Sequence, residues 1–122
     1  MITINNDKTI GITRGDVASF TLKVKQSNNT YYQFKPSDRV YFTVKKSYGD
    51  PNYIIRKIIT FRNPTDTATI SFNATDTNFG SLLASSRKYV YDISINETET
   101  VVGYDNDGAK YFIIYPEASN DE

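Results

Sequence analysis

The fold of this chain is decided by one stretch of alternating residues, Tyr89-Val90-Tyr91-Asp92-Ile93-Ser94-Ile95. Its large apolar and aromatic side chains share one parity, whereas Asp92 and Ser94 occupy the other. Because successive side chains of a strand point to opposite faces, this alternation predicts a strand with one buried face. We expect it to be a central strand that directs its tyrosines and isoleucines into the core.

Shorter alternating stretches surround this segment at intervals of about ten residues, with turn-forming residues between them. Strands are predicted at 2–4, 9–12, 17–25, 31–34, 40–45, 53–61, 68–72, 101–104 and 111–115. We expect the first two to be edge strands. Short strands at this spacing are typical of an all-β fold, an antiparallel β-sandwich that is either immunoglobulin-like or jelly-roll-like.

Residues 53–61 are an exception to the alternation, because both parities of this segment carry apolar side chains. Two explanations are open: both faces of the strand are covered, or a bulge shifts the phase partway along. We favour a bulge near Arg56 and Lys57, where the charged pair interrupts the apolar run.

Residues 73–86 contain the one helical segment that the sequence predicts. Thr75 or Asp76 is expected to cap a short helical turn. Phe79, Leu82 and Leu83 follow at spacings of three and four residues, which places them on one face of such a turn. We assign residues 1–116 to a single β-sandwich domain with at most one short helix, and residues 117–122 to a polar tail.

Composition excludes several broad classes of function. Fourteen Lys and Arg balance fourteen Asp and Glu, so no general attraction to nucleic acid or anionic lipid is expected. No apolar run approaches the roughly 20 residues that span a bilayer, and the first residues lack the features of a secretory signal. We therefore expect no nucleic-acid partner and no membrane partner. The chain is expected to remain in a cytoplasm or to be assembled there into something larger.

The absence of His and Cys removes most catalytic templates. It excludes the imidazole base, the thiolate nucleophile and the commonest transition-metal ligands. Pairs of carboxylates remain, and Asp16, Asp38, Asp76 and Asp92 are the residues that such chemistry would use. Each lies beside a turn or a strand end, where carboxylates commonly cap amides or pair with basic side chains. We expect them to be structural, and the chain to be no enzyme and to carry neither cofactor nor metal.

Two short motifs have a structural explanation beside a functional one. Asp105-Asn106-Asp107-Gly108 is similar to the start of a calcium loop, but its spacing is compressed and no closing Glu follows. We predict a β-turn there, with the glycine at a positive φ. Arg14-Gly15-Asp16 spells a tripeptide that some cell-surface receptors recognise, and we predict a turn with a locally hydrogen-bonded aspartate.

Tyrosines are the candidate recognition residues of the chain, which has ten Tyr and no Trp. An exposed Tyr offers an apolar ring and a polar hydroxyl, which suits a protein interface or a sugar-stacking platform. Asp92 joins this set as a hydrogen-bonding residue on the polar face of the central strand. The candidate interface residues are Tyr31, Tyr32, Tyr48, Tyr53, Asp92, Tyr104 and Tyr115.

Five stretches also follow one another in a recognisable order along the chain. They are Arg14-Gly15-Asp16 leading into Phe20-Thr21-Leu22, Asp38-Arg39-Val40-Tyr41-Phe42-Thr43-Val44-Lys45-Lys46, Asp76-Thr77 before Leu82, Tyr89-Val90-Tyr91-Asp92-Ile93, and Phe112-Ile113-Ile114-Tyr115-Pro116-Glu117. This order resembles small β-sandwich structural proteins of tailed phages and prophages, particularly the N-terminal domain of upper baseplate proteins.

The resemblance implies a non-catalytic module that docks onto other virion proteins in a baseplate, neck or fibre attachment. It also implies an oligomer located in the virion and assembled in the bacterial host cytoplasm. Upper baseplate proteins of this kind continue into a coiled or receptor-binding region, so a free-standing accessory or connector protein is an equal expectation. The alternative is a carbohydrate-binding module that presents exposed Tyr to a saccharide, and the lack of Trp places it second.

Overall fold

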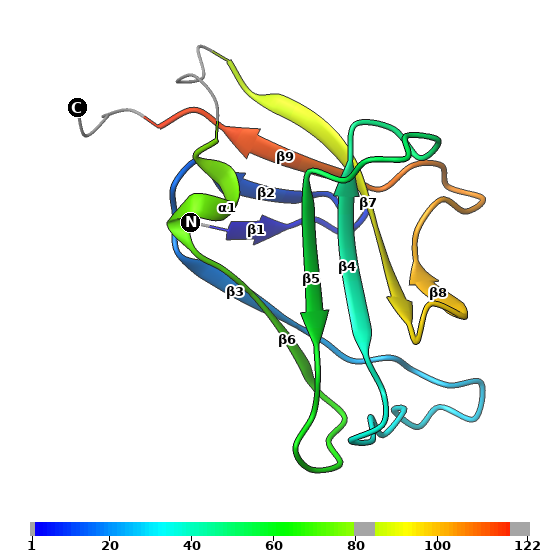
Figure 1. The fold of residues 1–122 in the computed structure, drawn as a ribbon. Helices are drawn as coiled ribbons and strands as arrows, with labels where there is room; N and C mark the ends of the chain where they lie inside the picture. Colours follow the sequence, from blue (N-terminus) through cyan, green and yellow to red (C-terminus); the bar gives the residue numbers. More distant parts are fainter. Residues whose placement is uncertain (1, 80–84, 118–122) are drawn as a thin grey trace.

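The computed structural model describes residues 2–79 and 85–117, and these form two β-sheets packed on one another around one core (Figure 1). The larger sheet runs in the order β1 (Ile2–Ile4), β2 (Ile10–Thr13), β9 (Tyr111–Tyr115), β7 (Arg87–Ile95), β4 (Val40–Lys45) and β5 (Ile55–Ile59), with β8 (Glu99–Val102) also paired to β7. The smaller sheet pairs β3 (Ala18–Leu22) with β6 (Ala68–Phe72). The prediction of an all-β fold with a short helix is confirmed.

The alternating residues 89–95 belong to the central strand β7. It pairs with β4 along one edge, and its other edge is shared by β9 and β8. The inward side chains are between 2% and 7% exposed, as predicted: Tyr89, Tyr91, Ile93 and Ile95. The outward parity is half-buried, so this strand presents its polar residues on the outer face of the larger sheet.

Aromatic rings pack against one another between the two sheets, and Phe42 of β4 lies at the centre of this aromatic cluster. Its side chain is 0% exposed. Its ring centre lies 5.5–5.9 Å from those of four other aromatic residues, Phe20, Phe72, Tyr91 and Phe112. Since Phe20 and Phe72 belong to the smaller sheet, one side chain contacts both layers of the fold.

The pairing of β2 with β9 corrects two sequence predictions. The two strands run parallel, with a register from Ile10↔Phe112 to Thr13↔Tyr115, so the larger sheet is mixed and not purely antiparallel. In addition, β2 is an interior strand between β1 and β9, so of the two strands expected at an edge β1 lies there and β2 does not. The inward residues Ile10, Ile12, Phe112 and Ile114 are at most 1% exposed, so burial by distant parts of the chain decides this pairing.

The bulge predicted near Arg56 and Lys57 is wrong. Strand β5 pairs with β4 in an unbroken register from Val40↔Ile59 to Val44↔Ile55. The apolar character of both parities arises because Ile58 lies on the outer face, where it is 55% exposed. A register shift does occur elsewhere, between β7 and β8 at Ile93/Ser94.

Residues 31–34 form isolated bridges instead of the predicted strand. Tyr31 is bridged to Lys25, and Phe34 is bridged to Thr65. The side chain of Phe34 is fully buried and stacks on Phe61, with ring centres 4.8 Å apart. This segment therefore changes partners within four residues, which prevents a continuous ladder.

The helix α1 (Ala74–Thr77) is present, but its predicted cap is wrong. Asn73 is the N-cap and accepts a hydrogen bond from the Thr75 backbone N–H. The Asp76 carboxylate accepts from the Asn73 backbone N–H at 2.8 Å, which completes a capping box. Phe79 is 36% exposed, whereas Leu82 and Leu83 lie outside the described residues. No helix among the described residues is long and apolar enough to cross a membrane.

Candidate functional site

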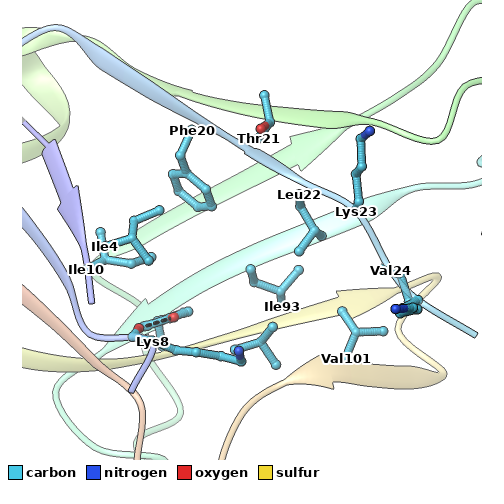
Figure 2. Close-up of a pocket in the computed structure, with 13 residues that line it drawn as sticks. Ile4, Lys8, Ile10, Phe20, Thr21, Leu22, Lys23, Val24, Ile93 and Val101 are labelled. Carbon is cyan, nitrogen blue, oxygen red and sulfur yellow. Dashed lines mark hydrogen bonds between the residues drawn. The ribbon is translucent and has the colours of Figure 1, made fainter. Parts of the chain in front are cut away.

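An apolar groove opens between β3 and the part of the larger sheet formed by β1, β7 and β8 (Figure 2). Its volume is about 300 Å³. Figure 2 shows Leu22 of β3 and Ile93 of β7 pointing toward one another across it. The apolar and aromatic residues that line it are Ile4, Ile10, Phe20, Leu22, Val24, Tyr91, Ile93, Val101 and Val102.

Alternation in β3 and in the extended residues 23–25 that follow it builds one wall of this groove. Phe20, Leu22 and Val24 point inward but are only half-buried, whereas the residues between them are exposed. The corresponding inward residues of β4, Val40 and Val44, are 0% exposed. The difference follows from position, because β4 has a neighbouring strand on both sides and β3 has one only on its β6 side.

The backbone edge of β3 that faces the groove is open. The hairpin after β3 is closed by the Tyr32 N–H bound to the Val24 C=O and by the Gln26 N–H bound to the Thr30 C=O, both at 2.7 Å. This pattern turns the N–H and C=O of Lys25 toward the opposite edge. By the same alternation, every second residue of β3 presents its backbone groups there, and no strand in the described residues pairs with them.

Three lysines border the groove: Lys8, Lys23 and Lys25. No acidic residue is among the residues that line it. The Lys23 ammonium lies 3.8 Å from the Asp66 carboxylate and 5.2 Å from the centre of the Tyr31 ring. Since the Lys23–Asp66 pair is long and solvent-exposed, it neutralises the rim only weakly. The groove therefore combines an apolar floor with a basic rim.

A second, polar groove lies on the outer face of the larger sheet, with a volume of about 420 Å³. The strand registers place Asp92, Thr43 and Arg56 in one row across β7, β4 and β5. The Arg56 guanidinium lies 4.9 Å from the Tyr41 ring centre and forms a 2.8 Å ion pair with Glu97.

Tyr53 borders the same outer groove, and its ring centre is 5.8 Å from the Arg56 guanidinium. Asp92 is half-buried there, and burial raises the pKa of its carboxyl group against the opposing effect of Lys45 and Arg56. The backbone of Gly103 packs closely, since a Cβ at that position would lie 3.3 Å from the Asp92 Cβ. The outer groove thus offers a carboxylate acceptor, a guanidinium donor and a tyrosine ring.

Tyr48 and Tyr104 lie next to one another, with ring centres 5.8 Å apart. The Tyr48 hydroxyl accepts from the Lys110 N–H at 2.9 Å and donates to the Tyr91 C=O at 3.0 Å. Burial raises the pKa of Tyr48. Its hydroxyl therefore holds the sheet together, and Tyr104, at 72% exposed, is the member of this pair that faces solvent.

Tyr32 belongs to a buried polar network around Asp38. The Asp38 carboxylate accepts hydrogen bonds from the Tyr32 hydroxyl at 2.7 Å, the Lys35 N–H at 2.9 Å and the Asn96 side chain at 2.9 Å. The hydrogen bond from Tyr32 is the main reason why the pKa of Asp38 is lowered, and it raises the pKa of Tyr32 to about 12. This aspartate has a structural role.

The candidate interface residues therefore do not form one surface. Tyr53 and Asp92 meet in the outer groove. Tyr31 lies beside Lys23 of the apolar groove, and Tyr115 covers Gly11 on the far part of the sheet.

Several residues that line the two grooves were not predicted from the sequence. They are Tyr41, Arg56 and Glu97 in the outer groove, and Leu22, Lys25 and Val101 in the apolar one. Alternation marks the face on which Tyr41 and Leu22 lie, but no local signal shows which strand has an open edge.

Both short motifs form turns, as predicted. Gly15 has a φ of 83°, and the Asp16 N–H donates to the Thr13 C=O at 3.1 Å. Arg14 is 8% exposed and forms a 2.8 Å ion pair with Glu117.

The 105–108 segment is a turn closed by the Gly108 N–H and the Asp105 C=O at 2.8 Å, with Gly108 at a φ of 95°. The Asp105 carboxylate is bound to the Lys110 ammonium at 2.7 Å. Among the described residues, no group of three or more acidic side chains could hold a metal ion.

No protein family, curated protein or solved structure matches this chain.

Proposed function

We propose that the chain is a non-catalytic structural module of a tailed-phage or prophage particle, which acts by docking onto other virion proteins. Its place is a baseplate, a neck or a fibre attachment, and it is assembled in the host cytoplasm as an oligomer. The observation that carries the proposal is the open edge of β3 beside an apolar groove.

An open strand edge is a binding surface because it presents unpaired backbone donors and acceptors. Proteins normally blunt such an edge or cover it, and many use it to take up an extended segment of a partner. In this chain the open edge lies beside half-buried side chains that line the groove, such as Leu22 and Val24. A partner that covers the groove would bury these side chains fully, as the strands of the larger sheet already do for their own.

The ionisable groups that are most deeply buried have structural partners, which also supports a docking role. Arg14 is bound to Glu117 and to the Asn78 carbonyl, and Lys110 is bound to Asp105. Asp38 is saturated by three donors. These charges stabilise the fold, whereas the half-buried carboxylate of Asp92 lines the outer groove.

Copy number in purified particles tests the proposal. Particles produced by the host that encodes the chain are purified, and the chain is quantified by mass spectrometry against a capsid protein. We expect a fixed copy number and an oligomer in sedimentation of the isolated chain. A monomer in sedimentation, together with absence from the particles, would overturn the proposal.

A carbohydrate-binding role is the second candidate, and the outer groove is the observation that favours it. Asp92 and Arg56 flank Thr43 in one row, at about twice the strand spacing, or roughly 10 Å. For a sugar ring stacked on Tyr53, the Asp92 carboxylate could accept a hydrogen bond from a sugar hydroxyl on one side, and the Arg56 guanidinium could donate one to a sugar hydroxyl on the other.

A glycan array with the intact chain tests this second role. Replacement of Tyr53 by Ala should abolish saccharide binding, whereas Tyr104→Ala, an exposed tyrosine outside the groove, should leave it unchanged. Absence of binding to every glycan on the array removes this candidate.

A further inference from the structure

We infer that the apolar groove binds an extended segment of a partner protein, in which apolar and acidic residues alternate, and that this segment adds to β3 as a further strand. The inference rests on the proposed docking function and specifies the chemistry of the partner. It is built from three features of the same edge: its backbone, its inward side chains and its outward side chains.

The backbone of β3 supplies the first recognition element. The N–H and C=O of Lys25 point away from the hairpin that occupies the other edge. On the alternation of an extended chain, the backbone groups of Thr21 and Lys23 point the same way. These residues form a continuous row of donors and acceptors, which an added strand satisfies without disturbing the β3–β6 ladder.

The inward side chains supply the second element. Phe20, Leu22 and Val24 are half-buried along the edge, and Ile93 and Val101 face them from the larger sheet (Figure 2). An added strand places every second side chain over this floor. Those side chains must be apolar, because the groove lining offers them mainly hydrocarbon contacts.

The outward side chains supply the third element. Lys23 and Lys25 follow β3 in extended chain and are exposed on the parity opposite to Leu22 and Val24, and Figure 2 shows Lys23 pointing away from the groove floor. Their cross-strand neighbours on the added strand would lie about 5 Å away between Cβ atoms, where opposite charges stabilise and like charges destabilise the pair. Lys8 adds a third positive charge at the groove. The outward parity of the partner is therefore acidic.

Two other occupants fit these features less well. A nucleic acid would match the lysines but would leave the apolar floor uncovered. A second copy of this chain could offer its edge strand β5, but Arg56, on the outward parity of that strand, would meet Lys23 or Lys25 with like charge. A separate protein with an acidic segment satisfies all three elements.

Synthetic peptides test the inference directly on the intact chain. The probe is a fluorescent peptide of about six residues, the usual length of a strand, in which Val alternates with Glu. The matched control replaces each Glu by Lys. We expect binding, measured by fluorescence anisotropy, to be at least about tenfold tighter for the acidic peptide, and the difference to shrink at high salt.

Backbone methylation separates strand addition from attraction between charges alone. Methyl groups are placed on alternate backbone nitrogens of the acidic peptide, in two versions of opposite parity. Only one parity of the peptide faces β3, so one version should lose binding and the other should retain it. Equal affinity for both versions would overturn the assignment of the β3 edge.

Charge reversal in the protein provides the complementary variant. The double variant Lys23→Glu and Lys25→Glu should bind the acidic peptide about tenfold more weakly and prefer the lysine peptide. Lys46→Glu, an exposed lysine outside the groove, is the control and should bind as the original chain does. Thermal unfolding of each variant establishes that the fold is retained. An unchanged preference in the double variant contradicts the inference.

Incorporation into particles distinguishes this inference from the proposed function. If the original chain and the double variant are incorporated equally, docking stands and the groove assignment is wrong. Loss of incorporation in the double variant alone supports both. If the original chain is absent from the particles while the peptide preference holds, the groove assignment stands and the virion role falls.

Discussion

The two sheets of this molecule are built from the same alternating pattern but are buried to different extents. In the larger sheet, β4 and β7 have neighbours on both edges, and their inward side chains are at most 7% exposed. In the smaller sheet, β3 has a neighbour on one edge, and its inward Phe20 and Leu22 are only half-buried. The larger sheet therefore provides most of the packing, and the smaller one retains an open strand edge.

The largest difference between the sheets is expected from two matched phenylalanines. Phe42→Ala in β4 should lower the free energy of unfolding by about 4 kcal/mol, because a fully buried ring leaves a cavity between both sheets. Phe20→Ala in β3 should cost about half as much, roughly 2 kcal/mol, because its ring is already partly exposed. Urea denaturation measures both values. Equal losses would mean that β3 is packed as tightly as β4.

The polar network beside the core is expected to rank next. Asp38→Asn should cost about 2 kcal/mol, since a buried carboxylate that accepts three hydrogen bonds is replaced. The pKa of Asp38 is lowered in the folded chain, so its contribution is complete above the unfolded value of about 3.9. It is lost as the pH falls through the lower folded value.

A pH series of denaturation experiments checks this prediction. The difference between the original chain and Asp38→Asn should be constant above about pH 5 and shrink in acid. Asp107→Asn, an exposed aspartate, serves as the control and should change stability little. A difference that grows in acid has the wrong sign for a lowered pKa.

Close packing at the edge of the larger sheet gives a smaller effect. A Cβ on Gly11 would lie 2.6 Å from the Tyr115 ring and 3.2 Å from the Thr3 hydroxyl, so Gly11→Ala should cost about 1–2 kcal/mol. Gly49→Ala is the matched control, because nothing lies within 4 Å of its Cβ position. Thermal unfolding compares the two variants. Similar melting temperatures would show that Tyr115 moves aside freely.

The outer groove should give the smallest effect, with the opposite sign. The pKa of Asp92 is raised by burial. Between the unfolded and the folded pKa, the folded chain therefore keeps a proton that the unfolded chain has released. The stability of the original chain therefore falls as the pH rises from about 3.9 through the folded value. Asp92→Asn should be more stable above that window by a few tenths of a kcal/mol, because solvent screens the half-exposed group.

Melting temperatures across the same pH range check the Asp92 prediction. The two chains should melt together below the unfolded pKa, and the variant should gain as the carboxylate ionises. A variant that is less stable at neutral pH would show that Asp92 makes a stabilising hydrogen bond or ion pair on the outer face.

Alternation located β4, β6 and β7 and the face that each one buries, because the side-chain period of a strand is a local property. Alternation was misleading at Ile58, which is apolar but lies on the outer face, so the segment around it appeared to need a bulge.

The helix cap was also predicted at the wrong residue. Asn73 caps α1 two residues before the nearer predicted cap, because its side chain and that of Asp76 form a reciprocal pair of hydrogen bonds.

The candidate site was predictable only in part. Asp92 and Tyr53 were both proposed as interface residues, but their meeting in one groove depends on the registers of β7, β4 and β5. Tyr48 and Tyr32 were proposed on the same grounds, yet their hydroxyls are occupied by internal hydrogen bonds. Composition identifies a tyrosine as a possible contact residue, whereas its neighbours decide whether it is available.

By itself, the sequence determined that this chain is all-β and that β7 is its central strand, and it identified tyrosines and Asp92 as candidate contact residues. The tertiary structure decided that β2 pairs in parallel with β9, that β3 keeps an open edge and that a basic rim surrounds an apolar groove. The reason is physical. The period of a strand is set by adjacent residues, but pairing and openness are set by which distant segments bury one another.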